Sequence, residues 1–340
     1  MKKKVIIDGD WGGDEMQLAS VLLADNQIEI VGATACYGNA GIDHVFNNGR
    51  NIMHLLDADN IPVYRGAGGP MNGAHVEEDV AHGEDGVGGV VLKPSPVPVE
   101  KKNAVDFILE QLRSNPEGTV TITASGPLTN IAMAFKKDPK AMMRVKDIIV
   151  MGGGVAGIKA ADMPVRLGNI TKNAEFNFYS APEDADMVLN SGLPITLLPM
   201  NCTRKLTFTP ERQEALKESL NFDKDAQEKI FDMMCAPADL DRRKFNSDPT
   251  MHDVHCALYF LHPELYSTFK GNVSVIREKG EELGRSKLKP NKDGRLNVAM
   301  KIKDANKCFD IFLKSITKVL GNKRLKRMQR LVLKNKIASR

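Results

Sequence analysis

No stretch of the 340-residue chain approaches the roughly 20 apolar residues that a membrane-spanning helix requires. At the amino terminus, Met-Lys-Lys-Lys is followed by a short apolar stretch that runs directly into acidic residues, which is not the pattern of a secretory signal. The chain also lacks paired cysteines, because its five cysteines are scattered and none forms a Cys-x-x-Cys pair. Neither a zinc site nor a disulfide framework is therefore expected, and these absences together predict a cytoplasmic protein without a membrane span.

The main body of the chain lacks an excess of positive charge. The formal net charge is +4, but residues 323–340 hold eight Lys or Arg and no acidic residue, which leaves residues 1–322 at −4. No nucleic-acid surface is expected on such a body. Apolar residues in the tail recur at helical spacing, which predicts a basic helix packed on the body; contact with anionic lipid or RNA is the alternative.

No internal repeat or interdomain linker interrupts the pattern, and apolar runs alternate with segments of helical periodicity. The predicted strands are 4–8, 29–36, 61–65, 119–125, 147–152 and 194–200, and the predicted helices are 14–25, 43–56, 102–114, 128–136, 182–191 and 209–218. This rhythm predicts a single large Rossmann-like α/β domain over residues 1–322, with a mainly parallel central sheet covered by helices on both faces. A small carboxyl-terminal hairpin (271–279 with 295–302) and a helix (304–319) follow, and residues 323–340 form a basic, helical tail.

The most informative stretch follows the first predicted strand. It places Asp8, Asp10, Asp14 and Glu15 within eight residues, with two glycines between them that allow a sharp turn. Helical apolar spacing begins at Glu15, so the last two acids lie at a helix start. Carboxylates this close repel one another unless a cation neutralises them or some stay protonated. At the carboxyl end of a first parallel strand, they predict a site for a hard divalent metal.

Other interpretations of residues 8–15 account for this stretch less well or rest on less of it. A solvated acidic turn would explain a random pair of acids, but less readily four acids around two glycines directly after a buried strand. An EF-hand loop counted from Asp8 needs an acid at its twelfth position, which is Ala19. An aspartyl-phosphate phosphotransferase also begins with strand-Asp-x-Asp, but Trp11 and the glycines after it do not match the phosphate-cradling context. A metal-dependent phosphoesterase stays open on the Asp-x-Asp strand end alone.

Further polar residues end or follow other predicted strands, where a site at the sheet edge would need them. These residues are Asn39, Ser125, Met151, Asn169, Glu175, Phe176, Asn177, His252 and Asp253. Each alone has an ordinary interpretation as a turn former, a helix cap or a packed core residue. The Gly/Pro-rich loop 66–100, which contains His82, is long enough to be either functional or disordered.

In combination and in order, these stretches resemble the inosine-uridine-preferring nucleoside hydrolases. The amino-terminal signature of that family is Asp-Thr-Asp-Pro-Gly-x-Asp-Asp-Ala, and here it stands as Asp-Gly-Asp-Trp-Gly-Gly-Asp-Glu-Met over residues 8–16. The resemblance runs from residue 4 to about residue 315. It also includes Gly38-Asn39, His82-Gly-x-Asp-Gly86, Gly126–Ala132, Met151-Gly-Gly153, Gly168-Asn169, Ala174–Asn177 and His252-Asp253.

The resemblance implies hydrolysis of the N-glycosidic bond of a ribonucleoside to ribose and free base, with Ca²⁺ as cofactor. By position, the implied metal ligands are Asp10, Glu15, the carbonyl of Ser125 and Asp253. Asp10 would also act as general base on the calcium-bound water, Asp14 would hold a ribose hydroxyl, and Asp8 would support the loop from behind. The implied substrate contacts are Asn39, Met151, Asn169, Glu175, Phe176 and Asn177, with the loop of His82 at the base site. Relatives in the family form homodimers or homotetramers, so the same is expected here.

The chemistry accounts for this residue set. Cleavage passes through an oxocarbenium-like ribosyl cation, which acids and amide oxygens near the ring stabilise. A shell of oxygen ligands without strict geometry suits calcium better than zinc or magnesium. His252 is the imidazole beside a predicted ligand, and it is the candidate general acid for the departing base. The purine-restricted branch has Trp at that position, which favours broad or inosine-uridine preference, although the sequence does not identify the base.

Three departures from the family pattern have consequences. Glu15 replaces an aspartate, and the extra methylene moves its carboxylate by about 1.5 Å. Gly9 and Trp11 replace Thr and Pro, and Trp11 is expected at the mouth of the site, where it could stack on a base. The segment 235–248 matches nothing in the family pattern. These departures leave an alternative open: a nucleoside- or ribose-binding homologue that has lost turnover.

Overall fold

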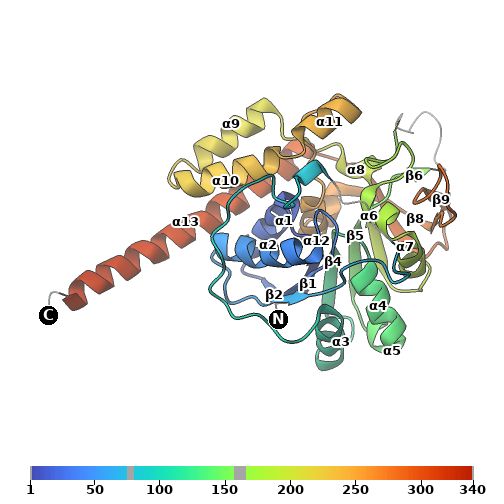
Figure 1. Cartoon of the computed structure of the whole chain (residues 1–340), viewed down its shortest axis with the longest axis horizontal. Helices are drawn as coiled ribbons and strands as arrows, with labels where there is room; N and C mark the ends of the chain where they lie inside the picture. Colours follow the sequence, from blue (N-terminus) through green and yellow to red (C-terminus); the bar gives the residue numbers. More distant parts are fainter. Residues whose placement is uncertain (1, 75–79, 157–165, 339–340) are drawn as a thin grey trace.

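Within residues 2–74, 80–156 and 166–338, which the computed structural model describes, ten strands form one sheet at the centre of the molecule (Figure 1). The strands are β1 (Lys3–Gly9), β2 (Ile28–Ala35), β3 (Val63–Arg65), β4 (Val120–Ala124), β5 (Asp147–Met151), β6 (Val155–Ala156), β7 (Ile195–Leu198), β8 (Tyr266–Val275), β9 (Ser286–Pro290) and β10 (Leu296–Ile302). Their order across the sheet is β3-β2-β1-β4-β5-β7-β10-β8-β9-β6.

The parallel part of the sheet determines where a site can form. Strand β1 pairs in parallel with both β2 and β4. Further strands lie outward on each side, with β3 beyond β2 and with β5 and β7 beyond β4. Neighbouring connections leave the sheet on opposite faces at such a point, which opens a crevice at the carboxyl ends of the strands. The carboxyl ends of β1 and β4 therefore frame the binding position. On the other side, β8 runs antiparallel to both β10 and β9.

Helices cover both faces of the sheet (Figure 1). They are α1 (Gly13–Ala24), α2 (Ile42–Leu55), α3 (Ala104–Ser114), α4 (Thr129–Lys137), α5 (Pro139–Met142), α6 (Phe176–Ser180), α7 (Pro182–Leu189), α8 (Met200–Thr203), α9 (Pro210–Ser219), α10 (Lys224–Cys235), α11 (Ala238–Phe245), α12 (Val254–Leu261) and α13 (Ala305–Ala338). Side chains alternate between the faces of a strand, so Val5 and Ile7 pack with α1, α2, α12 and α13, whereas Ile6 packs with α3, α4 and α7.

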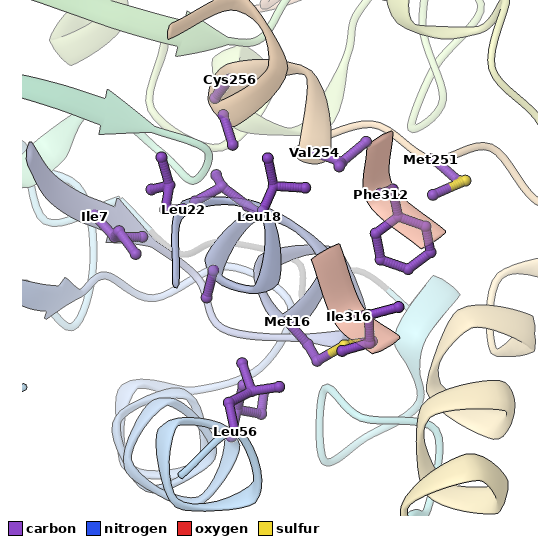
Figure 2. Packing of buried hydrophobic residues seen from close by; sticks show 14 of the residues in the cluster. Ile7, Met16, Leu18, Leu22, Leu56, Met251, Val254, Cys256, Phe312 and Ile316 are labelled. Atoms are coloured by element: carbon purple, nitrogen blue, oxygen red, sulfur yellow. The ribbon is translucent and has the colours of Figure 1, made fainter. Parts of the chain in front are cut away.

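The larger core fixes the two helix starts that carry acidic residues. Helix α1 packs against both α12 and α13. Figure 2 shows the apolar side chains at these contacts, which are Met16, Leu18 and Leu22 of α1, Val254 and Cys256 of α12, and Phe312 and Ile316 of α13. Burial of each large apolar side chain contributes about 1.5–3 kcal/mol, so the packing fixes α1 relative to α12. Asp14 and Glu15 in the first turn of α1, and Asp253 at the N-cap of α12, are positioned by this packing.

Helix α13 continues without interruption from Ala305 to Ala338 and includes the basic tail. Its first half packs against α1, and its carboxyl-terminal part extends away from the rest of the molecule instead of folding back onto it (Figure 1). Among the described residues, no helix is both long and apolar enough to cross a membrane.

The predicted α/β architecture is confirmed. Each predicted strand and helix corresponds to an observed one, with β1 to β5, β7, α1 to α4, α7 and α9 at or near the predicted bounds. The predicted hairpin is incomplete, because β8 pairs with β10 as expected but also with the unpredicted β9 between them in sequence. Strand β9 was missed because Ser286-Lys-Leu-Lys-Pro290 is short and rich in lysine. In the long loop 66–100, the described part contains a short 3₁₀ helix at Val80–His82, and residues 75–79 lie outside the described chain.

One half-buried carboxyl group in the sheet, that of Asp147, gives a pH-dependent prediction. Asp147 begins β5, and its Oδ2 accepts a hydrogen bond from Thr196 Oγ1 on β7 at 3.0 Å. Burial raises the pKa of Asp147 to about 6 from its ordinary value of 3.8. Because the folded-state pKa is the higher one, ionisation opposes folding near neutral pH, and this effect is absent below 3.8.

Asp147→Asn is therefore expected to raise the free energy of unfolding at neutral pH by about 1–2 kcal/mol, and to have no such effect in acid. Urea unfolding of both proteins at the two pH values measures the difference. An equal gain at both pH values, or a loss at neutral pH, would contradict the assignment.

Candidate metal centre

Three carboxylates from distant parts of the sequence converge at the carboxyl edge of β1. One oxygen from each of Asp10, Glu15 and Asp253 lies within 4.8 Å of the others, and all three residues are buried. Asp10 follows β1, Glu15 lies in the first turn of α1, and Asp253 is the N-cap of α12. Three buried carboxylates at this separation can all be ionised only if a cation lies among them.

The position of Asp10 is fixed by the loop that follows β2. Its Oδ2 accepts a hydrogen bond from the Asn39 backbone N–H at 3.0 Å, and the Asn39 side-chain amide donates to the Asp10 carbonyl at 3.2 Å. A Cβ atom on Gly38 would lie 2.0 Å from Asp10 Oδ2, so only glycine allows this approach. Burial, and then the charge of Glu15, raises the pKa of Asp10 well above its ordinary value.

Glu15 is anchored to the same loop through both oxygens. Its Oε2 accepts from the Gly12 N–H at 2.7 Å, and its Oε1 accepts from Ser125 Oγ at 2.9 Å and from the Asp10 N–H at 3.2 Å. A glutamate at this helical position satisfies the free N–H of the N-cap residue, as in a capping box. The carboxylate therefore links β1, α1 and the end of β4.

Burial, and then the charge of Glu15, also raises the pKa of Asp253 well above its ordinary value. The neighbouring carbonyl of Ser125 accepts a hydrogen bond from Asn177 Nδ2 at 2.9 Å, and a carbonyl oxygen has a second lone pair for another partner. Close packing holds this turn against Asp10, because a Cβ on Gly126 would lie 2.9 Å from the Asp10 backbone nitrogen. The donor set is made of oxygen alone and carries several negative charges, which fits a hard divalent cation.

Asp8 lies beneath the cluster and outside the cavity. Its Oδ1 accepts hydrogen bonds from Thr34 Oγ1 at 2.5 Å and from Asn130 Nδ2 at 2.8 Å. Burial raises its pKa to about 6. These bonds tie β1 to β2 and to α4, which is the position of a residue that supports the loop from behind.

A small cavity opens over the carboxylates. It is lined by Asp10, Asp14, Asn39, His82, Ser125, Met151, Asn169, Glu175, Phe176, Asn177, His252 and Asp253. The site residues expected from the sequence are among them, except Glu15, which joins the carboxylate cluster without lining the cavity, and Asp8 and Trp11. The structure thus brings together side chains up to 243 positions apart, from Asp10 to Asp253.

On one side of the cavity, Glu175 and the amides are held by backbone groups. The Glu175 carboxylate accepts from the Asn177 N–H at 2.8 Å and from the Gly153 N–H at 2.6 Å, and caps α6. Asn177 Nδ2 also donates to the Met151 carbonyl at 3.2 Å, and Asn169 Oδ1 accepts from the Phe176 N–H at 2.9 Å. These polar groups form a rigid wall before any ligand binds.

Two imidazoles, those of His82 and His252, also line the cavity. His252 Nδ1 is 2.7 Å from Thr203 Oγ1, and burial lowers the pKa of His252 well below its ordinary value, so the ring is neutral in the free protein. His82 Nδ1 is buried and has no hydrogen-bond partner within the described residues. Asp14 Oδ2 accepts a hydrogen bond from the backbone N–H of His252 at 3.4 Å, and burial raises the pKa of Asp14 to about 7.

The expectation for Trp11 was wrong. Its side chain is fully buried in the larger core, and its Nε1 donates to the Thr34 carbonyl at 2.9 Å. The ring packs so closely on α2 that a Cβ on Gly49 would lie 2.9 Å from it. Trp11 faces the core because Thr34 and Gly49 provide a partner and space there, so it offers no stacking face to a base.

The unmatched segment divides between surface and interior. Asp239 and Arg242 on α11 form an exposed ion pair. Asp241 on the same helix is buried, and its Oδ2 accepts from the Thr250 N–H at 2.7 Å, directly before the loop that carries His252. Burial raises the pKa of Asp241 to about 6.

The comparison with known families agrees with this geometry. Residues 5–310 match the family model described as inosine-uridine preferring nucleoside hydrolase. The chain belongs to that family. An uncharacterized protein of Schizosaccharomyces pombe is 34% identical over 83% of this chain and 88% of its own length. The pyrimidine-specific ribonucleoside hydrolase RihB of Escherichia coli is 28% identical over 84% of this chain and 87% of its own.

Solved structures of nucleoside hydrolases have the same fold. The purine-preferring ribonucleoside hydrolase of Gardnerella vaginalis superposes with a TM-score of 0.83 at 26% identity, covering 93% of this chain and 99% of that one. A plant nucleoside hydrolase gives a TM-score of 0.82 at 25% identity over the same shares of the two chains. The comparisons thus show the nucleoside hydrolase fold, and the buried acidic cluster is a feature of this structure.

Sequence reasoning missed several residues that position the site. Thr203 contacts His252, but no role was assigned to its segment. Asn130 contacts Asp8, but it was noted only as part of the matched stretch Gly126–Ala132. Gly38 was noted only as part of the Gly38-Asn39 match to the family, although its missing side chain makes room for Asp10. For Asp241, the only available signal was an acid on a charged helix, which does not distinguish it from the exposed Asp239.

Proposed function

We propose that this protein hydrolyses the N-glycosidic bond of ribonucleosides, with a calcium ion held by Asp10, Glu15, Asp253 and the carbonyl of Ser125. The observation that carries the proposal is the convergence of three buried carboxylates within 4.8 Å beneath a cavity lined by amides and imidazoles. When bound, the ion supplies a positive charge that lowers the pKa of a coordinated water and orients the ribose diol.

Asp10 is suited to accept the proton of the attacking water. Its Oδ2 is held by the Asn39 N–H, so the carboxylate has a fixed direction at the floor of the cavity. Asp14 lies beside it and is placed to hold a ribose hydroxyl. As the glycosidic bond breaks, positive charge develops on the sugar ring, and the surrounding carboxylates and the amide oxygens of Asn169 and Asn177 stabilise it.

The leaving base needs a hydrogen-bond donor, and the imidazoles are placed to provide one. Because Thr203 engages Nδ1 of His252, the other ring nitrogen remains for a ligand in the cavity. The unpartnered Nδ1 of His82 is a second such group. Either ring can donate to an electronegative atom of the base as it departs with the bonding electrons.

His252→Ala is expected to lower kcat for inosine or uridine by about 100-fold or more, because the base must leave without assistance. A synthetic aryl riboside with a good leaving group needs no such help, so its turnover should change by less than about threefold. Comparison of kcat for the two substrates distinguishes assistance to the leaving base from a general effect of His252 on the site. His262→Ala, at the far end of α12, is the matched control; equal losses on both substrates would contradict the role of His252.

The proposal as a whole is tested by incubating the protein with inosine, uridine and an aryl riboside, with added calcium, and assaying released ribose. Curated and structural relatives include a pyrimidine-specific and a purine-preferring enzyme, so a panel of bases is needed to establish preference. Release of ribose from at least one nucleoside is expected. No release from any substrate at any calcium concentration would contradict the proposal.

A nucleoside-binding protein without turnover is the second candidate. It is favoured by one observation, namely that both oxygens of Glu15 already accept hydrogen bonds from Gly12 and Ser125, which compete with a metal. Calorimetry with a nucleoside, followed by chromatography of the mixture, distinguishes the two candidates. Binding heat with intact nucleoside supports the second candidate, and free base excludes it.

A further inference from the structure

Gly9 and Glu15, two residues that depart from the family pattern, occupy one small space at the end of β1. A Cβ atom on Gly9 would lie 2.7 Å from Glu15 Oε1, 2.8 Å from Glu15 Cγ and 2.8 Å from Ser125 Oγ. Side-chain carbon atoms do not approach other groups this closely. With Glu15 in its present place, any residue other than glycine at position 9 would force a displacement.

The backbone at position 9 cannot relieve such a clash. Gly9 pairs with Ala35 in the parallel ladder, and its carbonyl accepts a hydrogen bond from the Cys36 N–H at 2.9 Å. The preceding residue, Asp8, is paired on both sides, with β2 and with β4. Movement of this segment would break hydrogen bonds in the centre of the sheet.

Glu15 has no alternative position either. It is completely buried, and α1 is held by its packing against α12 and α13. Moving the carboxylate outward would leave the Gly12 N–H and Ser125 Oγ without their present partner in a buried place, which is unfavourable. The room left by the missing side chain of Gly9 is therefore the room that Glu15 uses.

These constraints are reciprocal. Aspartate at position 15 would be one methylene shorter, which withdraws the carboxylate by about 1.5 Å and leaves a gap beside Gly9. We infer that Gly9 and Glu15 are a compensating pair, in which the absent side chain at position 9 lets a glutamate place the third carboxylate of the metal cluster. This inference rests on the proposed function, because it assigns Glu15 a position in the calcium site.

A double-mutant cycle tests the pair. Gly9→Ala alone should weaken calcium binding at least about tenfold, because the new methyl group displaces Glu15, and Glu15→Asp alone should weaken it similarly. The double variant Gly9→Ala with Glu15→Asp should recover to within about threefold of the original affinity. A shorter acid leaves room for the methyl group beside residue 15, and it releases Ser125 Oγ from its hydrogen bond to Glu15, so that this hydroxyl can rotate away from the new Cβ. Calorimetric titration measures the calcium affinity of each variant. The thermal midpoint in calcium-free buffer measures whether each variant is folded.

Gly69→Ala is the matched control, because nothing lies within 4 Å of a Cβ at that position. It should leave calcium affinity unchanged. If Gly9→Ala does not fold, folding and calcium binding by the double variant still report the compensation. Additive losses in the double variant, or full affinity in Gly9→Ala, would overturn the pairing while the proposed function stands. Absence of calcium binding by the unaltered protein would overturn the proposed function and the metal role of this pair together.

Discussion

Asp10→Asn is expected to lower kcat/KM for ribonucleosides by about 10³-fold or more while the protein stays folded, because it removes a negative charge from the proposed metal site together with the proposed proton acceptor. The same substitution should not destabilise the calcium-free protein. Burial and the charge of Glu15 raise the pKa of Asp10 well above its ordinary value, so the ionised carboxylate opposes folding when no cation is present. Asparagine removes that charge and retains an oxygen for the Asn39 N–H. Steady-state kinetics and thermal unfolding with and without calcium measure the two effects.

The control for Asp10→Asn is Asp293→Asn, which makes the same change at an exposed carboxylate in the turn between β9 and β10. It should affect neither activity nor the calcium dependence of stability. Activity of Asp10→Asn within a few-fold of the unaltered protein would contradict the catalytic role of Asp10. A lower melting temperature of the variant in calcium-free buffer would contradict the argument that the Asp10 charge opposes folding.

Removal of calcium is expected to have the second large effect. After prolonged dialysis against EGTA, the protein should lose its hydrolytic activity, and added calcium should restore it. Because the ion would bind the folded state and not the unfolded chain, calcium at a hundredfold excess over its Kd should add about 2.7 kcal/mol to the free energy of unfolding. Activity assays and calorimetric melting of the dialysed and restored protein provide the measurement.

Asp253→Asn provides the matched comparison for chelation. Loss of one carboxylate of three should greatly reduce both the stabilisation by calcium and the activity. The melting point of the calcium-free protein should not fall, because burial and the charge of Glu15 raise the pKa of Asp253 well above its ordinary value, so that its ionised form opposes folding. Full activity of the unaltered protein in excess EGTA would refute a role for the ion.

The parts of the fold with strong local signals were predictable from the sequence. Val5 to Ile7 form a continuous apolar run that ends in acids, and such a run at this length indicates a strand buried on both faces. The helix from residue 13 is marked by two glycines and an acidic first turn. Strand β9 carries no comparable pattern, because only Ser286 and Leu288 of its five residues are buried.

The convergence of distant residues at one site was predicted from the resemblance to the family, because no local pattern in the sequence indicates it. Asp14 and His252 are 238 positions apart and joined by a backbone hydrogen bond, and no periodicity in the sequence indicates that contact. The prediction for Trp11 was wrong for a related reason: its position after an acidic strand end suggested an exposed side chain. Its burial depends on Thr34 and Gly49, which belong to the following strand and helix. The proposed compensation between Gly9 and Glu15 likewise depends on their proximity in the fold, since each departure taken alone indicates a damaged site.

A crystal structure grown with calcium chloride and a ribose-like inhibitor would test the central claim most directly. The account predicts one ion bound at about 2.3–2.6 Å by oxygens of Asp10, Glu15, Asp253 and the Ser125 carbonyl, with two ring hydroxyls completing its shell. An empty cluster at saturating calcium, or an ion bound elsewhere with the inhibitor away from Asp10, would contradict it.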